Sequence, residues 1–210
     1  MAGIFHADGE CEMVAVMKFT PDHTPDDLGA RLRRIMMSDA WSMETLKIVR
    51  ELALPDWAIG AGFVRSLVWD QLAGNTSRTP LPDIDVLYFD ANDPAPGPER
   101  DLEALLREIR DGLPWSVHNQ ARMHLRNGDA PYRDTDDAIA HWLETPTALA
   151  VRLEADDGLT VLAPLGLDDL FGLTVSPTDA GVRNIDQYRA RIKSKGWADR
   201  WPGLQIHGLG

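Results

Sequence analysis

The amino-acid sequence predicts one α+β domain, of the mixed α/β kind, in which helices flank a single mixed sheet. Apolar residues recur at helical spacing in some segments and form short, strand-like runs in others, with glycine, proline and aspartate between them. The 210 residues are enough for one full-sized core. We expect residues 1–23 to form a poorly defined N-terminal arm and residues 24–210 to form the domain, with helical N-terminal and C-terminal parts.

Two helices are predicted before the first strand. Thr24 and Pro25 suit a helix cap and a first helical position, and the buried stripe that follows consists of Leu28, Leu32, Ile35 and Met36. A second helix is expected over residues 42–53, and Pro55 closes it. Both helices have the pattern of structural elements.

Strands and helices then alternate along the centre of the chain. A short buried strand at residues 57–59 precedes Gly60-Ala61-Gly62, and the helix after this turn stops at Gly74. Residues 84–89 are predicted to form a second strand. A proline-rich turn leads into a helix whose core-facing residues are expected to be Leu102, Leu105, Leu106 and Ile109.

The last third of the chain predicts one more strand, a hairpin and a helical tail. The strand covers residues 116–124, and a helix capped by Asp134 follows it. Residues 147–154 and 159–163 form the hairpin, because an Asp-Asp-Gly turn separates them. The tail from Leu167 is expected to be helical.

Composition excludes several classes of function. A formal net charge of −12 argues against broad nucleic-acid binding, which needs Lys and Arg to neutralise phosphates, so small substrates are favoured. No apolar run approaches the roughly 20 residues that cross a bilayer, so no membrane partner is expected. The single cysteine, Cys11, cannot form an internal disulfide, which favours the cytoplasm. The sequence makes no prediction of oligomeric state.

Asp83 and Asp85 are the candidate catalytic and metal-binding pair. They are separated by one residue on a predicted strand, so both carboxylates project from the same face. Two adjacent acids repel, and a hard cation such as magnesium or manganese between them relieves the repulsion. An isolated Asp-x-Asp is more often a pair of solvated surface acids, so the pattern alone leaves both interpretations open.

Gly60, Ala61 and Gly62 are the candidate phosphate-binding turn. They join a strand to a helix, and a helix N-terminus exposes unpaired N–H groups and a partial positive charge to an anion. Arg65, in the first turn of that helix, is placed to add a charged contact to a phosphate. The alternative is a tight turn that needs glycine for its backbone angles alone.

These residues resemble a known family. The stretch Trp57-Ala-Ile-Gly-Ala-Gly-Phe, followed by Leu81-Pro-Asp-Ile-Asp-Val, is similar to the DNA polymerase β-type nucleotidyltransferase superfamily. A subgroup of bacterial nucleotidyltransferase family proteins is also matched over about residues 57–202, through Pro82-Asp-Ile-Asp-Val, Asn119-Gln-Ala-Arg-Met-His, Trp142-Leu-Glu-Thr and Gly166-Leu-Asp-Asp-Leu. The resemblance implies a polymerase β-like nucleotidyltransferase fold, with an NTP and magnesium between the glycine turn and the aspartate pair.

The sequence departs from the superfamily at one point. Active members use a third carboxylate on a neighbouring strand, and Glu154 is the best placed acid by chain order. Asn119 and Gln120 instead sit on an earlier predicted strand, where the resemblance leads us to expect an acid. If Glu154 lies elsewhere, the general base for a hydroxyl nucleophile is missing and a binding-only role is favoured.

Polar residues around the third predicted strand are candidates for a substrate pocket. Gln120, Arg122 and His124 would share one strand face and could line an acceptor or nucleotide pocket together with Asn119, or form a partly exposed polar face. Positive charges also gather near the C-terminus, at Arg183, Arg189, Arg191, Lys193 and Lys195. Such runs bind phosphates in some proteins but are usually solvated helix faces.

The preferred hypothesis is an enzyme that moves NMP from an NTP to a hydroxyl of an unknown small-molecule or protein acceptor. Asp83, Asp85 and Glu154 would be its catalytic residues, and magnesium or manganese its cofactor. The alternative is a catalytically inactive nucleotidyltransferase-fold protein that binds a nucleotide or a partner as a regulatory module. A weaker third possibility is an RNA-directed transferase that uses Lys193 and Lys195.

Overall fold

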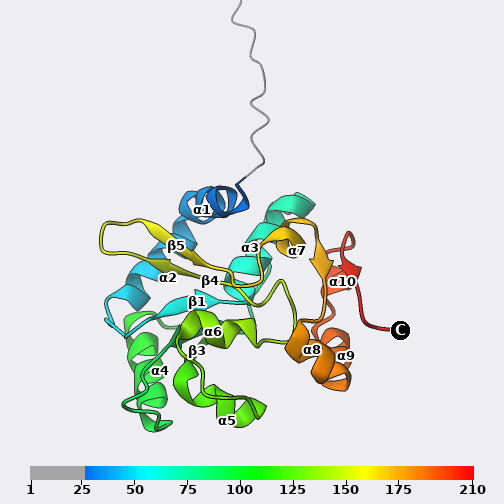
Figure 1. The fold of residues 1–210 in the computed structure, drawn as a ribbon. Coiled ribbons are helices and arrows are strands. Elements are labelled where there is room, and N and C mark those ends of the chain that lie inside the picture. Colours follow the sequence, from blue (N-terminus) through cyan, green and yellow to red (C-terminus); the bar gives the residue numbers. More distant parts are fainter. Residues whose placement is uncertain (1–26) are drawn as a thin grey trace, which may run out of the picture.

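A five-stranded mixed sheet forms the centre of the computed structural model, which describes residues 27–210. Its strand order is β3-β2-β1-β4-β5, and only β2 and β3 run parallel to each other (Figure 1). The strands are β1 (Ala58–Gly60), β2 (Ile84–Tyr88), β3 (Trp115–Asn119), β4 (Ala150–Leu153) and β5 (Leu159–Leu162). The predicted α+β class and the predicted hairpin are confirmed. The N-terminal arm, Thr24 and Pro25 lie outside the described residues.

Helices lie on both faces of this sheet. A second, two-stranded parallel sheet pairs β6 (Thr174–Val175) with β7 (Gln205–Ile206) inside the tail that was expected to be helical. The helices are α1 (Leu28–Ser38), α2 (Ala40–Arg50), α3 (Gly62–Ala73), α4 (Gly97–Ile109), the 3-10 turn η1 (Gln120–Arg122), α5 (Met123–Asn127), α6 (Thr135–Ala140), α7 (Asp168–Phe171), α8 (Asp179–Arg183), α9 (Ile185–Lys195) and α10 (Trp197–Arg200).

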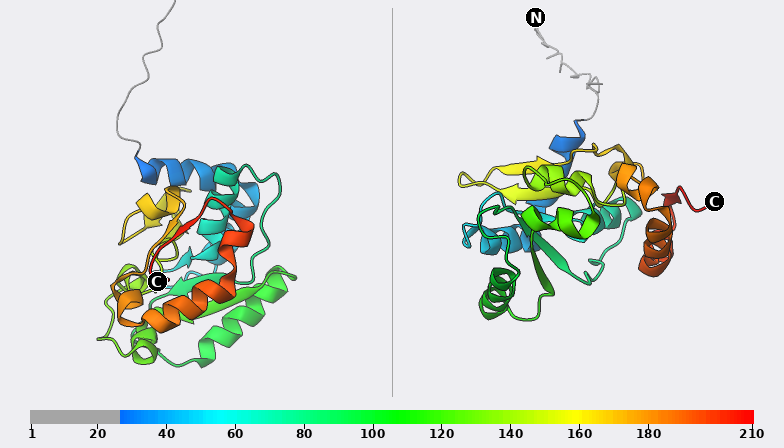
Figure 2. Two further views of the ribbon diagram at one scale, coloured as in Figure 1. Left: turned by 90° about the vertical axis from the view of Figure 1, so that its right-hand side faces the viewer. Right: turned by 60° about the horizontal axis from the view of Figure 1, so that its bottom comes forward.

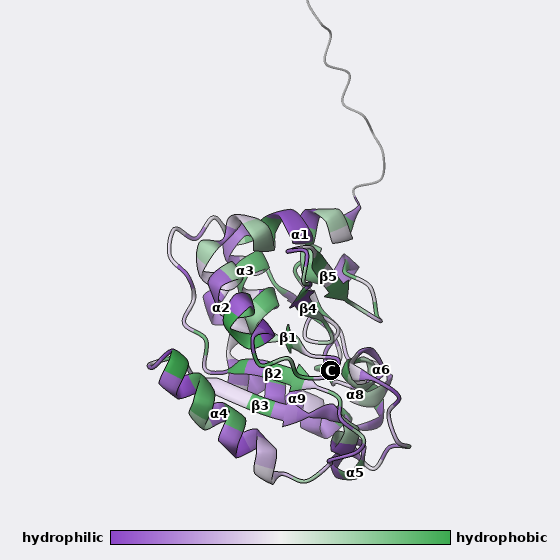
Figure 3. Cartoon of the chain, turned by 90° about the vertical axis from the view of Figure 1, so that its left-hand side faces the viewer, coloured by the Kyte–Doolittle hydropathy of each residue, from purple (hydrophilic) through white to green (hydrophobic). Residues whose placement is uncertain are grey.

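The two faces of the sheet have different partners. Ile59, Ile84 and Val86 are fully buried in the main core with the apolar residues of α1, α2 and α3. Because strand side chains alternate, Leu87 points to the other face, where a smaller cluster packs beneath α6. Figure 3 shows α2, α3 and α4 to the left of the sheet and α6 and α8 to its right. The main core also takes in apolar residues of α7, α9 and α10, whereas the smaller cluster on the other face involves α6.

The strand register places three chain segments side by side at one end of the strands: the end of β1, the start of β2 and the start of β4. Gly60, the last residue of β1, pairs with Ala150 at the start of β4. Ile59 pairs with Val86, so Gly60 comes level with the beginning of β2. The C-terminal segment, orange to red in Figure 2, lies at one end of the molecule. The turn after β1 and the start of β2 therefore meet by sheet pairing.

The apolar face of α4 is narrower than predicted. Leu106 is fully buried, but Leu105 and Ile109 are 43% and 50% exposed, so the expectation that both face the core is wrong. The buried stripe continues from Leu106 to Glu99, whose carboxylate accepts a hydrogen bond from Asn119 N of β3 at 2.6 Å. Since α4 covers the edge strand, only one row of its side chains reaches the sheet.

The third strand ends five residues earlier than predicted. The Asn119 side chain accepts a hydrogen bond from Ala121 N at 3.1 Å and caps η1, which turns the chain away from the sheet. Gln120 and Arg122 therefore lie in η1 and His124 lies in α5. The prediction that these three residues share a strand face is wrong, because a short polar side chain satisfies the backbone better than another strand partner.

Two helix ends follow local signals. Asp27 caps α1 by accepting from Ala30 N at 3.1 Å, so the described helix begins three residues after Pro25. Gly74 ends α3 in the left-handed conformation, at φ 70°, as predicted. Among the helices of residues 27–210, none has the length and apolar character of a membrane span.

Candidate functional site

The turn between β1 and α3 is held by backbone contacts. Ala61 N donates to Leu149 O at 3.0 Å, and Ala61 itself adopts φ 50° and ψ −118°, a conformation that L-residues rarely adopt. A Cβ on Gly60 would stand 3.1 Å from both Leu149 O and a methyl of Leu87. Gly60 is thus required by close packing, whereas a Cβ on Gly62 would meet only Arg65 Nη2 at 3.6 Å and Leu81 at 3.9 Å.

Asp83 and Asp85 line one cavity with this turn. Asp85 is the second residue of β2, and Asp83 comes directly before the strand rather than within it. Ile84 between them is fully buried in the main core. A cavity of about 120 Å³, which we name the small cavity, is lined by both carboxylates together with Ala61 and Gly62. The structure therefore brings together the aspartate pair and the glycine turn.

Burial and mutual repulsion shape the charge of the pair. Burial, and after it the neighbouring charge of Asp83, raise the pKa of Asp85 to about 6. The opposing influences on this pKa are cations, with Arg191 first, then Lys195 and Arg65. A positively charged partner therefore stabilises the ionised form of the Asp85 carboxylate.

Four cationic side chains surround the two acids in the small cavity: Arg65, Arg191, Lys195 and Arg200. Arg65 is only 6% exposed, and its guanidinium lies 5.3 Å and 4.3 Å from the ring centroids of Trp69 and Trp197. Burial lowers the pKa of Arg65 to about 10, so it stays charged at neutral pH, and its buried Nε has no hydrogen-bond partner among the described residues. The small cavity is accordingly a cationic site with an unused donor.

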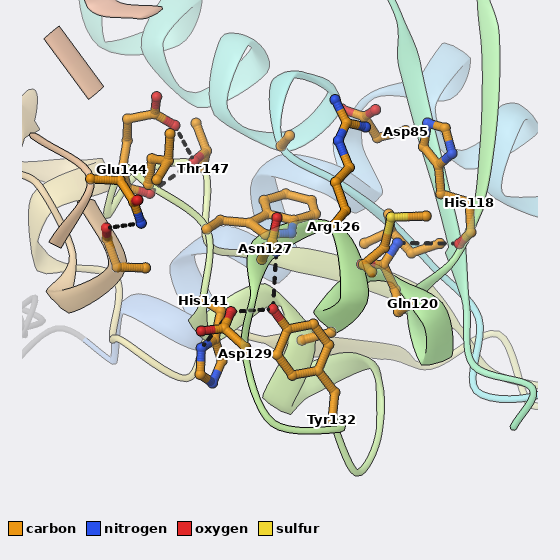
Figure 4. Close-up of a pocket in the computed structure, with 18 of the residues that line it drawn as sticks. Asp85, His118, Gln120, Arg126, Asn127, Asp129, Tyr132, His141, Glu144 and Thr147 are labelled. Atoms are coloured by element: carbon orange, nitrogen blue, oxygen red, sulfur yellow. Dashed lines mark hydrogen bonds and ion pairs between the residues drawn. The ribbon is translucent and has the colours of Figure 1, made fainter. Parts of the chain in front are cut away.

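A second and larger cavity, of about 400 Å³, adjoins the small one. Figure 4 shows residues that line this larger cavity. We name it the large cavity. Its walls come from β2, β3, η1, α5, α6, α8, α9 and the segments that connect them. The two cavities share Ala61, Asp85 and Arg191. Asp85 therefore stands where an elongated ligand would pass from one cavity to the other.

Polar groups form one side of the large cavity. Tyr132 OH donates to Asp129 Oδ2 at 2.6 Å and accepts from Asn127 Nδ2 at 3.0 Å. His141 Nδ1 lies 3.4 Å from Asp129 Oδ2, and Figure 4 shows this group across the cavity from Asp85 and His118. These residues supply both donors and acceptors to a polar ligand.

On another side lies a buried carboxylate, Glu144, whose side chain is 1% exposed. Its Oε2 accepts from Thr147 Oγ1 at 2.9 Å, and its Oε1 lies 2.7 Å from Arg191 Nε. Sequence reasoning did not find this pair, because 47 positions separate the two residues and no local spacing relates them.

Glu154 lies away from the aspartate pair, so the prediction that it supplies the third carboxylate is wrong. It follows the last residue of β4, four residues beyond Ala150, which puts it about 13 Å along the strand from the glycine turn. Its carboxylate pairs with Arg152 Nε at 2.9 Å and lines neither cavity. The reason is that β4 runs antiparallel to β1 and carries Glu154 to the opposite edge.

Of the four predicted pocket residues, only Gln120 lines the large cavity. Arg122 Nε donates to Glu99 Oε1 at 3.1 Å, and Asn119 bonds to the backbone of Asp90 at 2.8 Å and 3.0 Å. His124 uses Nδ1 to contact Ala121 O at 2.9 Å. Asn119, Arg122 and His124 thus secure the turn after β3, while their chain neighbours Met123 and Arg126 reach the cavity.

The position beside Asp85 on the neighbouring strand carries no acid. Asp85 pairs with Ser116 across the parallel β2–β3 ladder, and Leu87 pairs with His118. His118 Nε2 lies 3.0 Å from Ser116 Oγ, and burial lowers the pKa of His118, which keeps its imidazole neutral at pH 7. Within residues 27–210, no cluster of three or more His, Cys, Asp or Glu side chains is suited to hold a metal.

Asp83 and Asp85 nevertheless have the donor chemistry for a magnesium or manganese ion. These ions prefer oxygen ligands, and magnesium is commonly bound by one or two carboxylates together with substrate phosphates. The small cavity offers two carboxylates and four cations that attract phosphate, so the residues fit an ion that arrives with a phosphate ligand.

Comparison with known proteins gives a consistent family and fold. A family model described as nucleotidyltransferase matches residues 47–206. A protein solved by NMR and described as a CCA-adding enzyme head domain is 29% identical, with a TM-score of 0.74 over 84% of this chain and 94% of that one. A search of curated protein sequences finds no significant match.

Larger solved structures share the fold at lower identity. A CCA-adding enzyme in complex with CTP is 14% identical, with a TM-score of 0.55, and the match covers 84% of this chain but 43% of the enzyme. A complex of a CCA-adding enzyme with ATP gives 14% identity and a TM-score of 0.54. The chain thus matches less than half the length of these enzymes, and the similarity is one of fold.

Proposed function

Because the chain belongs to the nucleotidyltransferase family, we propose that it moves NMP from an NTP to a hydroxyl of a small-molecule or protein acceptor. One observation carries the proposal. Asp83 and Asp85 share a cationic cavity with the turn at the start of α3, and at Asp85 this cavity meets a larger polar one. A triphosphate needs the first environment, and a nucleoside or an acceptor suits the second.

The triphosphate lies in the small cavity. Arg65, Lys195 and Arg200 surround it with positive charge, and the N-terminus of α3 adds backbone N–H donors. Arg65 supports this assignment most strongly, because a buried guanidinium with a free Nε gains a charged hydrogen-bond partner when an anion enters. CTP and ATP are the nucleotides in the CCA-adding enzyme complexes of the same fold, so both are first choices as ligands.

Asp83 and Asp85 hold magnesium or manganese when the nucleotide binds. The bound ion supplies neutralisation of phosphate charge and polarisation of the α-phosphate. The protein contributes position: β2 fixes Asp85 at the junction of the cavities, and Ile84 anchors the pair from the core face. Metal dependence is therefore part of the proposal.

The transfer is an in-line displacement at the α-phosphorus. The acceptor oxygen forms a bond to phosphorus from the large cavity, and the bond from phosphorus to the oxygen shared with the β-phosphate breaks. Pyrophosphate leaves into the small cavity, where Lys195 and Arg200 balance its charge. The hydroxyl proton passes to Nε2 of His118, a neutral imidazole that lines the large cavity.

The acceptor is small or is a protein side chain, since a net charge of −12 disfavours a nucleic-acid acceptor. The single cysteine of the sequence suits a reducing compartment, so we place the activity in the cytoplasm. A second candidate is a nucleotide-binding module without catalysis. It is favoured by one observation, that Glu154 lies away from the aspartate pair and Ser116 stands at the neighbouring strand position.

Calorimetric titration with magnesium and each NTP tests the binding part. We expect the parent to bind at least one NTP and Asp83→Ala to lose most of that affinity, while Asp101→Ala on the exposed face of α4 binds as the parent does. Equal binding by all three proteins would show that Asp83 does not contact the nucleotide and metal.

An assay of label transfer distinguishes the enzyme from the nucleotide-binding module without catalysis. NTP labelled at the α-phosphate is incubated with the protein and a metabolite extract, and incorporation is followed by chromatography. An enzyme gives labelled product and pyrophosphate, and His118→Gln slows both without weakening NTP binding. NTP binding with no incorporation would favour the binding module.

A further inference from the structure

Arg191 of α9 stands at the junction of the two cavities. It lines both of them, and among residues 27–210 this property is shared by Ala61 and Asp85 alone. Lys195, one helical turn further along α9, lines the small cavity alone, and so does Arg200 of α10. The arginine and lysine side chains around the candidate site are thus divided: Arg126 lines the large cavity, Arg191 stands at the junction, and Arg65, Lys195 and Arg200 line the small cavity.

A buried carboxylate fixes Arg191 at this junction. The side chain of Glu144 is 1% exposed, and its Oε1 lies 2.7 Å from Arg191 Nε. Among the described residues, no donor makes a hydrogen bond of standard geometry to this oxygen, so its contact with Arg191 is that of an ion pair. The other oxygen is occupied by Thr147 Oγ1 at 2.9 Å. A buried carboxylate requires a positive partner, so the pair restrains the arginine side chain, which would otherwise be mobile.

The contact with Glu144 leaves most of the guanidinium donors available. Arginine has five N–H groups in a planar fork, and the contact with Glu144 uses Nε. The side chain of Arg191 remains 41% exposed, so its terminal nitrogens are open to a ligand. A fixed, accessible guanidinium at the junction is suited to grip a phosphate that spans both cavities.

We infer that Glu144 positions Arg191 to contact the α-phosphate of the bound NTP, the phosphate at which transfer occurs. This inference rests on the proposed function. In the product state, pyrophosphate occupies only the small cavity, where Lys195 and Arg200 contact it. Arg191 lines the small cavity at its junction with the large one, so it contacts the α-phosphate of the complete nucleotide and contributes little to the binding of pyrophosphate. Glu144 acts through Arg191 as a positioning residue.

Calorimetric titrations with two probes test the inference: the magnesium complex of the best NTP, and inorganic pyrophosphate with magnesium. For Arg191→Met we expect a loss of NTP affinity of roughly tenfold or more and little change for pyrophosphate. For Lys195→Met both affinities fall. Lys193→Met is the matched control, because Lys193 is exposed on the same helix and lines neither cavity, and it binds both probes as the parent does.

A double-mutant cycle tests the role of Glu144. Glu144→Gln is expected to weaken NTP binding by several-fold and to have no further effect once Arg191 is methionine. Effects that add in the double variant would overturn the positioning role. Arg191→Lys, which keeps the charge but loses the fork, is expected to bind NTP between the parent and Arg191→Met, and thermal denaturation of each variant confirms that it is folded.

The remaining outcomes separate this inference from the proposed function. If the parent binds neither NTP nor pyrophosphate, the proposed function fails and the inference fails with it. If the parent binds both and Arg191→Met weakens them equally, or weakens neither, the inference alone is overturned. NTP binding without pyrophosphate binding by the parent would also overturn it, since the small cavity would not hold the leaving group.

Discussion

Asp85 on β2 lies directly opposite Ser116 on β3 in the parallel ladder of the central sheet. Residues paired in this way project from the same face, so a hydroxyl stands beside the half-buried carboxylate of Asp85. The arrangement explains why the site has two acids at its centre and suggests how a third can be added.

Ser116→Asp places a carboxylate next to Asp85. We expect it to raise affinity for manganese by about tenfold, because each added oxygen ligand strengthens binding of a hard cation. Without metal the variant is less stable than the parent, since the new charge repels Asp83 and Asp85. Manganese titration by electron paramagnetic resonance measures the gain, and Ser116→Asn, which has no charge, is the control. An equal gain from asparagine would contradict the electrostatic reason.

Asp85→Asn changes the pH dependence of stability. The folded-state pKa of Asp85, about 6, lies above the ordinary aspartate value of 3.8, so the folded protein binds the proton more tightly than the unfolded chain. The contribution of Asp85 is fully present below about pH 4 and is lost as pH rises through about 6. The parent therefore loses stability relative to Asp85→Asn across this window, by at most about 3 kcal/mol. Urea denaturation at a series of pH values without metal measures it.

Asp101→Asn is the control for that series. Asp101 is exposed on α4, so its replacement leaves the pH profile of the parent unchanged. A parallel profile for the parent and Asp85→Asn would show that the Asp85 proton is not linked to folding.

Arg122→Met destabilises the fold without altering nucleotide affinity. The side chain of Glu99 is 8% exposed and pairs with Arg122, so the substitution leaves a buried carboxylate with one fewer charge partner. We expect a loss of about 2–4 kcal/mol in the free energy of unfolding, measured by urea denaturation. Arg107→Met is the control. It breaks an exposed i,i+4 ion pair with Glu103 within α4 and lowers the free energy of unfolding by about 0.5 kcal/mol or less. A loss of NTP affinity in folded Arg122→Met would contradict this expectation and show that Arg122 is part of the binding site.

Gly60→Ala and Gly62→Ala separate packing from binding in the turn. The added methyl group at position 60 meets Leu149 O and Leu87 at 3.1 Å, and we expect a loss of about 1–3 kcal/mol in unfolding free energy. At position 62 the nearest atom is Arg65 Nη2 at 3.6 Å, so the variant folds normally but narrows the small cavity and weakens NTP binding several-fold. Thermal denaturation and calorimetry test both statements. A stable Gly60→Ala variant would show that β4 can move.

Part of the fold was readable from local patterns. The strand before Gly60, the stop at Gly74, the hairpin after residue 147 and the cap at Asp134 all follow from turn chemistry and apolar spacing. The end of β3 could not be read in this way. Asn119 could continue the strand or cap a turn, and only its contacts with Asp90 and Ala121 show that the strand ends there.

The aspartate pair and the glycine turn stand at adjacent positions in the sheet, and their short spacing made them visible in the sequence as one candidate site. The long-range partners were not visible in this way. The run of basic residues from 183 to 195 looks uniform along the chain, yet the packing of α9 points Arg191 and Lys195 into the cavities and leaves Lys193 exposed.

Local spacing encodes strands, helices and turns, so the class of fold, the alternation of its central elements and the residues that bracket the candidate site could be read from the sequence. Which charges meet at the site depends on the folded chain. The tertiary structure removed Glu154, because an antiparallel strand carries it to the far end of the sheet, and it brought in Glu144 and Arg191, because the packing of α9 places Arg191 2.7 Å from Glu144. The interaction energy of two charges depends on the distance between them in space, and this distance cannot be read from their separation along the chain.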